Sequence, residues 1–174
     1  MNAINFSELT YLKKGSAIQQ KGFDAITSSL IMEKLSHYDP VLVGTLPLDI
    51  FIETSDLDIL CYFENMDEFI QLLNEKFVDQ SNFKLRTTTL GGIESVVANF
   101  DHDGFAFEIV GQPVPVRDQV AYRHMINEWR ILEERGDSFK KQIIELKKSG
   151  MKTEPAFAKA LGLQGDPYQA VLNC

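Results

Sequence analysis

Two short apolar runs constrain the fold of this chain more than any other feature of its sequence, VLVG at 41–44 and LDILCYF at 57–63. Each run is too short for a buried helix and is rich in aliphatic side chains, so each predicts a buried strand. Three further strands are predicted in FKLRTTTL, ESVVANFD and FAFEIVG, with turns at Gly91-Gly92 and Asp103-Gly104. These patterns predict a mixed sheet of about four to five strands.

Apolar residues at helical spacing flank the first two strands. We expect one helix from Ala17 to about Tyr38, because its apolar residues fall on related faces. We expect a second, amphipathic helix in NMDEFIQLLNEKFVDQ, with Asn65 or Asp67 as its cap.

Beyond Pro115 the sequence has helical spacing throughout. One arc of the first helix there is apolar and should pack on the sheet; it contains Ala121, Met125, Trp129, Ile131 and Leu132. We expect Gly136 to break this helix, a second helix to stop at Gly150, and a short third helix in TEPAFAKALGLQG. The predicted fold class is therefore α/β, an α+β mixed sheet with flanking helices and a C-terminal helical tail.

Length and composition fit one globular unit. The chain has 174 residues, 44% of them hydrophobic, which is enough to bury one sizeable core. We expect a core over residues 1–116 and a helical extension over residues 117–174 that packs on it. No run of eighteen apolar residues and no signal-peptide pattern is visible, so we expect a cytoplasmic protein that is not in a membrane.

Charge is unevenly distributed along the chain. The net charge of −8 argues against a broad surface for nucleic acid. Residues 1–116 carry 7 basic and 17 acidic side chains, whereas residues 117–174 carry 10 and 8. The first segment suits cations and the second can contact an anionic ligand, although a solvated helical surface explains the same balance. The apolar arcs of the tail also permit a homodimer.

Two carboxylates open the second apolar run. Side chains alternate along a strand, so Asp56 and Asp58 should point away from the core that receives Leu57 and Ile59. Carboxylates about 7 Å apart on one face repel each other, and a hard divalent cation would relieve that repulsion. Glu108 interrupts the apolar strand FAFEIVG and is expected at the same site, as a third metal ligand or as a general base.

Gly44 and Thr45 end the first apolar run. They offer close backbone approach, free N–H groups and a hydroxyl, which are the contacts that a polyphosphate needs. Taken singly, such features also have structural explanations: a turn, a strand-end bend, or an ion pair between Glu108 and a basic residue such as Arg117. Their order and spacing in one chain favour a functional site.

The order Gly-Thr, Asp-x-Asp and a later acidic residue resembles the nucleotidyltransferase (polymerase-β-like) superfamily. The stretches VGTLPLDI…SDLDIL and FEIVGQPVPVRDQVAYRHMINEWRIL are more narrowly similar to small bacterial proteins of unknown function with that fold. The resemblance implies that Asp56, Asp58 and Glu108 hold Mg²⁺ or Mn²⁺ and that an NTP is the substrate. It further implies transfer of a nucleoside monophosphate to a hydroxyl of a small molecule or protein.

The loop between the two apolar runs departs from the superfamily, because LPLDIFIETS has no basic residue and adds the acids Asp49 and Glu53. Positive groups for a nucleotide must then come from elsewhere, and the polar arc of the first tail helix is the first candidate, followed by Lys84 and Arg86. The residues expected to contact the nucleotide are Gly44, Thr45, Ser55, Arg123 and Arg130.

Two alternatives of other classes stay open. A degenerate member of the superfamily would bind a nucleotide or metal without chemistry, and the acidic loop favours this reading. An interaction module, as in antitoxins built on this fold, would instead dock a partner on the helical tail.

Overall fold

The computed structural model describes residues 4–174, so the first three residues of the predicted 1–116 core lie outside the described residues. Its sheet has five strands in the order β1-β2-β5-β4-β3. The strands are β1 (Val41–Val43), β2 (Leu57–Tyr62), β3 (Ser81–Leu90), β4 (Ile93–His102) and β5 (Phe105–Gln112). β2 and β5 are parallel at the centre of the sheet, and the other neighbours are antiparallel. The predicted mixed sheet is confirmed.

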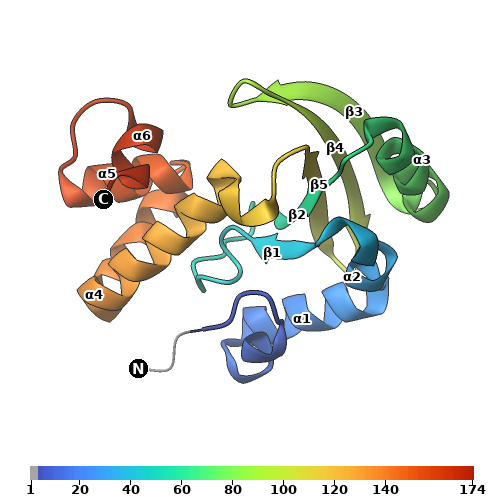
Figure 1. Cartoon of the computed structure of the whole chain (residues 1–174). Coiled ribbons are helices and arrows are strands. Elements are labelled where there is room, and N and C mark those ends of the chain that lie inside the picture. The colour runs from blue at the N-terminus through green and yellow to red at the C-terminus, as the bar shows by residue number, and fades with distance from the viewer. Residues whose placement is uncertain (1–3) are drawn as a thin grey trace.

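Helices cover both faces of this sheet (Figure 1). They are η1 (Thr10–Lys14), α1 (Ala17–Ser29), α2 (Ile31–Lys34), η2 (Ser36–Tyr38), α3 (Met66–Phe77), η3 (Val116–Asp118), α4 (Val120–Lys148), α5 (Thr153–Leu161) and α6 (Pro167–Leu172). The helices α1 to α3 share one apolar cluster with Ile59 and Phe107, and α4 to α6 share another with Leu60 and Val110. Alternate residues of β2 and β5 therefore serve two separate cores.

The first predicted helix is wrong as a single element. Leu30 has a φ of 55°, a left-handed conformation that divides α1 from α2. The Ser29 hydroxyl donates to the Ile26 carbonyl at 2.8 Å and accepts from the Ile31 amide at 3.2 Å. Such local side-chain hydrogen bonds compete with the helical ladder and help to end the helix there.

The cap of α3 is Asn65, whose side chain accepts from the amides of Asp67 and Glu68. The helix α6 was not predicted. Its signals were nevertheless present, because Asp166 caps it and Pro167 occupies its first turn.

The long helix α4 is interrupted at Gly136, where φ is 74° and ψ is −170°, so the predicted break is confirmed. Met125 and Leu132 of the predicted apolar arc are buried, but the arc also buries two polar residues, His124 and Glu128. No helix in the described part of the chain combines the length and the hydrophobicity that a membrane span needs.

Candidate functional site

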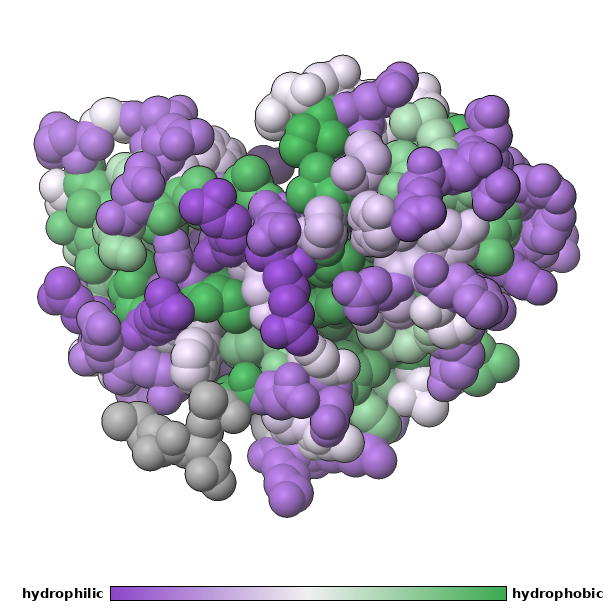
Figure 2. All heavy atoms as spheres, viewed as in Figure 1, coloured by the Kyte–Doolittle hydropathy of each residue, from purple (hydrophilic) through white to green (hydrophobic). Residues whose placement is uncertain are grey.

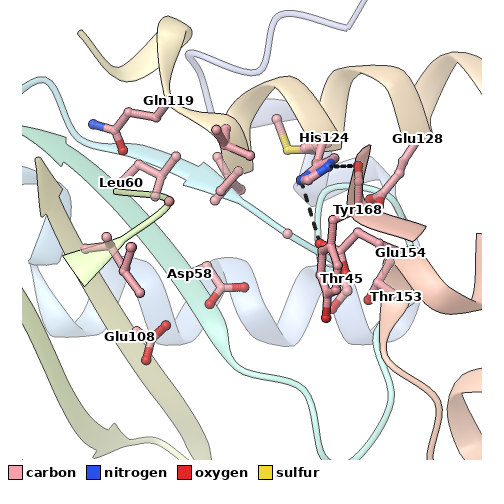
Figure 3. Close-up of a pocket in the computed structure, with 18 of the residues that line it drawn as sticks. Thr45, Asp58, Leu60, Glu108, Gln119, His124, Glu128, Thr153, Glu154 and Tyr168 are labelled. Atoms are coloured by element: carbon pink, nitrogen blue, oxygen red, sulfur yellow. Dashed lines mark hydrogen bonds and ion pairs between the residues drawn. The ribbon is translucent and has the colours of Figure 1, made fainter. Parts of the chain in front are cut away.

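Two of the three predicted carboxylates, Asp58 and Glu108, line a cleft of about 540 Å³ between the sheet and α4, α5 and α6. Figure 2 shows a notch between the β3–β4 hairpin and the helices α5 and α6, where this cleft opens. Asp58 and Glu108 are register partners on the parallel strands β2 and β5. Partner residues on neighbouring strands are about 4.8 Å apart and share a face. Figure 3 shows both carboxylates directed into the same open space.

Gly44 lies against the first of these carboxylates. Its φ is 77°, and a Cβ added there would clash with Oδ2 of Asp58. A side chain at this position would therefore be strained and would fill the space beside the carboxylate. The adjacent Thr45 hydroxyl is buried and has no hydrogen-bond partner among the described residues. The Gly-Thr pair thus presents backbone and one free hydroxyl to the site.

The pKa of the Asp58 carboxyl group is strongly raised. Burial and, to a smaller extent, the nearby carboxylates of Glu108 and Asp56 raise its pKa to about 8, with Lys147 opposing them. A buried acid with more acidic than basic neighbours is stabilised by any added cation. This is the electrostatic environment expected of a cation ligand.

Glu108 has two partners, one on the neighbouring strand β4 and one on β3 beyond it. Its Oε2 accepts from Nδ2 of Asn99 at 3.0 Å and lies 3.7 Å from Nη2 of Arg86. The ion pair considered with Arg117 does not form, because Arg117 donates to the Ser7 hydroxyl instead. Arg86, a secondary candidate from the sequence, is therefore the basic group that reaches the carboxylates from β3.

Asp56 and Ser55 lie just before β2, not in it, and Asp56 is exposed. The Ser55 hydroxyl accepts from the Ile52 amide at 3.1 Å. Both residues line a second cavity of about 320 Å³ that shares Thr45 and Asp58 with the cleft. Within residues 4–174, no three His, Cys, Asp or Glu side chains are grouped closely enough to enclose a metal ion. Three-residue ligation by Asp56, Asp58 and Glu108 therefore stays a prediction.

Arg123 and Arg130 are not brought to the carboxylates. They line a different groove, of about 420 Å³, together with Arg117 and the end of α6. The polar arc of α4 that carries them faces away from the cleft, because the cleft is lined by His124 and Glu128 of the same helix.

The family is decided by a match over most of the chain. Residues 24–174 match the model of a family described as a domain of unknown function, DUF4269. This chain is a DUF4269 protein. A search of curated proteins found no match to it.

The DUF4269 chain is also similar in fold to solved nucleotidyltransferase structures. Cid1, studied for its RNA terminal uridylyl transferase activity, has a TM-score of 0.58 at 12% identity over 88% of this chain and 52% of its own. The GLD-2/RNP-8 complex has a TM-score of 0.56 at 13% identity, over 87% of this chain and 60% of its own. A cytoplasmic RNA terminal U-transferase has a TM-score of 0.55 at 14% identity, over 90% of this chain and 54% of its own. The DUF4269 chain thus has a nucleotidyltransferase-like fold and spans about half the length of these proteins.

Two lysines of the DUF4269 chain, Lys147 and Lys152, line the cavity beside Asp58 and were not predicted. Lys147 donates to the Ile50 carbonyl at 2.8 Å, and burial lowers its pKa to about 8 against the opposing effect of Glu128 and other acids. Lys152 precedes α5, whose N-terminus has no side-chain cap. Their only sequence signal was the basic balance of residues 117–174.

A second unpredicted group of the DUF4269 chain lies at the far end of the cleft. His124 hydrogen-bonds the Tyr168 carbonyl through Nε2 at 2.8 Å, and its Nδ1 lies 3.8 Å from Oε1 of Glu154 (Figure 3). Glu128 is buried beside them, and burial raises its pKa well above the usual value, with Glu154 adding to the effect. Polar residues on an otherwise apolar helix face were the available signal.

Proposed function

We propose that this chain binds an NTP with a divalent cation and transfers its nucleoside monophosphate to a hydroxyl of a small molecule or protein. The observation that carries the proposal is the pairing of Asp58 with Glu108 across β2 and β5, directly beside Gly44. The nucleotidyltransferase-like fold supports it, and Cid1 has been solved with MgGTP and with MgATP.

The residues present fit a divalent cation. Mg²⁺ and Mn²⁺ prefer oxygen ligands, and Asp58 is a half-buried acid whose charged neighbours are mainly other acids. Asp56, Asp58 and Glu108 would hold the ion, which when bound neutralises phosphate charge and polarises the α-phosphorus. Glu108 would also accept the proton of the attacking hydroxyl.

Phosphate contacts come from both sides of the second cavity in this proposal. Gly44, Thr45 and Ser55 offer backbone and hydroxyl groups from the loop that precedes β2. Lys147 and Lys152 supply the positive charge that the loop lacks, and α5 adds the uncapped amides of its first turn. Since Arg123 and Arg130 line another groove, they have no phosphate contact in this arrangement.

The test is thermal unfolding with ATP, GTP, CTP and UTP, each with and without Mg²⁺ or Mn²⁺. A ligand at about 100 times its dissociation constant adds about 2.7 kcal/mol, which shifts the midpoint by several degrees. We expect a metal-dependent shift that is lost in Asp58→Asn and kept in the control Asp137→Asn, a change of an exposed acid on α4. An equal shift in Asp58→Asn would rule out the proposed site.

A specific observation favours binding without catalysis as the second candidate function. The guanidinium of Arg86 and the amide of Asn99 both engage Glu108, the residue proposed to accept the proton. Turnover with a panel of NTPs and hydroxyl acceptors separates the two functions. Nucleotide binding without release of pyrophosphate would establish the second candidate.

A further inference from the structure

Several buried polar atoms of the cleft lack partners. Five buried side-chain polar atoms among residues 4–174 have no hydrogen-bond partner, and three of them belong to residues that line the cleft. These are Thr45 Oγ1, Gln119 Oε1 and Glu128 Oε1. Buried polar atoms are nearly always paired with protein, water or ligand, so this concentration indicates a place built to receive polar groups.

Of the three, Oε1 of Glu128 costs the most free energy when it is left without a partner, because it belongs to a carboxyl group and the residue is only 3% exposed. Two donors at this end of the cleft have other partners. His124 is hydrogen-bonded through Nε2 to the Tyr168 carbonyl, and Lys147 donates to the Ile50 carbonyl. No described residue donates a hydrogen bond to Oε1 of Glu128. A ligand that donates hydrogen bonds would supply what the protein does not.

The charge around Glu128 further restricts the ligand. Glu154, the other acid at this end of the cleft, increases the negative potential at Glu128, and only Lys147 opposes it appreciably. Figure 3 shows both acids on the helix side of the cleft, across from the pair formed by Asp58 and Glu108. An anionic group would be repelled here, whereas an ammonium would be attracted.

The rest of the cleft between these acidic ends is mainly apolar. Its apolar lining comes from all five strands and α4, and contains Val43, Leu60, Leu90, Ile93, Val110 and Met125. The volume of about 540 Å³ is that of a small-molecule site. A ligand of this cleft should therefore combine an apolar body with a cationic end.

We propose that the cleft binds an amine-bearing molecule, with its apolar body between the sheet and α4 and its ammonium at Glu128. A hydroxyl elsewhere on this molecule accepts the nucleoside monophosphate, gives its proton to Glu108 and displaces pyrophosphate, a role that rests on the function proposed above; the binding site itself does not. Glu128 is then a specificity-determining residue, because it selects the acceptor by charge without touching the reacting phosphate.

The experiment compares two probes of nearly the same shape. Tyramine carries an ammonium on an aromatic body, and tyrosol carries a hydroxyl in the same place. Each is titrated by calorimetry into the full chain, first without nucleotide and then with ATP and Mg²⁺. We expect tyramine to bind about tenfold more tightly, a preference of about 1.4 kcal/mol.

The preference should disappear in Glu128→Gln, which keeps the side-chain shape but cannot ionise. It should persist in the control Glu133→Gln, an exposed acid on the same helix. Circular dichroism checks that both variants fold, and the methyl resonance of Met125 reports whether the probe lies in the cleft. Equal binding of the two probes, no binding of either, or a preference that survives Glu128→Gln would each overturn the inference. Because the first titration omits nucleotide, failure of the nucleotide site gives a different result from failure of the amine site.

Discussion

The two faces of the central sheet use the same strands for opposite purposes. On the side of α1 to α3, β4 and β5 contribute Phe100 and Phe107, which stack with ring centroids 5.0 Å apart. On the side of α4 and α5, β2 and β5 contribute the acids Asp58 and Glu108, and the charges nearest to Asp58 are mainly negative. The alternation of side chains along a strand allows one face to stabilise the fold while the other carries charge that opposes it.

The largest expected effect comes from a substitution on the face that packs against α1 to α3. Phe100 also stacks on Phe77 at 5.3 Å and is 1% exposed, so Phe100→Ala should leave a cavity in a closely packed aromatic cluster. We expect a loss of about 3–5 kcal/mol in the free energy of unfolding. Urea denaturation at 25 °C measures it. A loss below about 1 kcal/mol would show that the aromatic stack is not the main support of this face.

A change on the charged face should raise the free energy of unfolding instead of lowering it. Because the pKa of Asp58 is raised to about 8 in the fold, the folded state holds a proton that the unfolded state releases near pH 4. The free energy of unfolding should therefore fall as the pH rises from about 4 to 8. Asp58→Asn should reduce this fall and stabilise the metal-free chain at pH 8 by on the order of 1 kcal/mol or more.

The measurement for this variant is urea denaturation at pH 5 and pH 8 without divalent cations. Part of the fall should remain in the variant, because the pKa of Glu128 is also raised by burial. Identical slopes in the wild type and Asp58→Asn would mean that Asp58 is solvated or paired in solution.

The smallest expected effect concerns the loop that joins the two faces. Asp49 accepts hydrogen bonds from the Ser16 hydroxyl and from Nζ of Lys140, the latter at 2.5 Å. This half-exposed pair ties the loop before β2 to α1 and to α4. Lys140→Met should lower the free energy of unfolding by about 0.5–1 kcal/mol and make the loop more susceptible to proteolysis. No change in either measurement would show that the loop is held by its apolar residues alone.

The strands and the paired acids could be predicted because their signals are local. Alternation in LDILCYF and the isolated acid in FAFEIVG need only their own neighbours in sequence. Asp49 shows the limit of such reasoning, since it was read as an acid that opposes phosphate. Its charge is in fact paired with Lys140, which lies 91 residues away in the chain.

The basic residues nearest to the acids could not be predicted for a similar reason. Helical periodicity separated a polar arc with Arg123 and Arg130 from an apolar arc, but it did not indicate which arc would face the acids. The cleft is lined by the predominantly apolar arc, and the lysines nearest to the acids come from the far end of α4 and from the start of α5. Only the tertiary arrangement of the tail decides this.

The break at Gly136 determines that arrangement. A continuous helix would carry Lys147 about 28 Å along its axis from Glu128, too far for either charge to influence the other. Each group nevertheless affects the pKa of the other, because the helix is interrupted at Gly136 by a backbone conformation that is practically restricted to glycine. A single residue remote from any ligand thus acts as the joint that sets which charges meet in the cleft. Replacing Gly136 would change which charges lie near one another in the cleft without altering any residue that lines it.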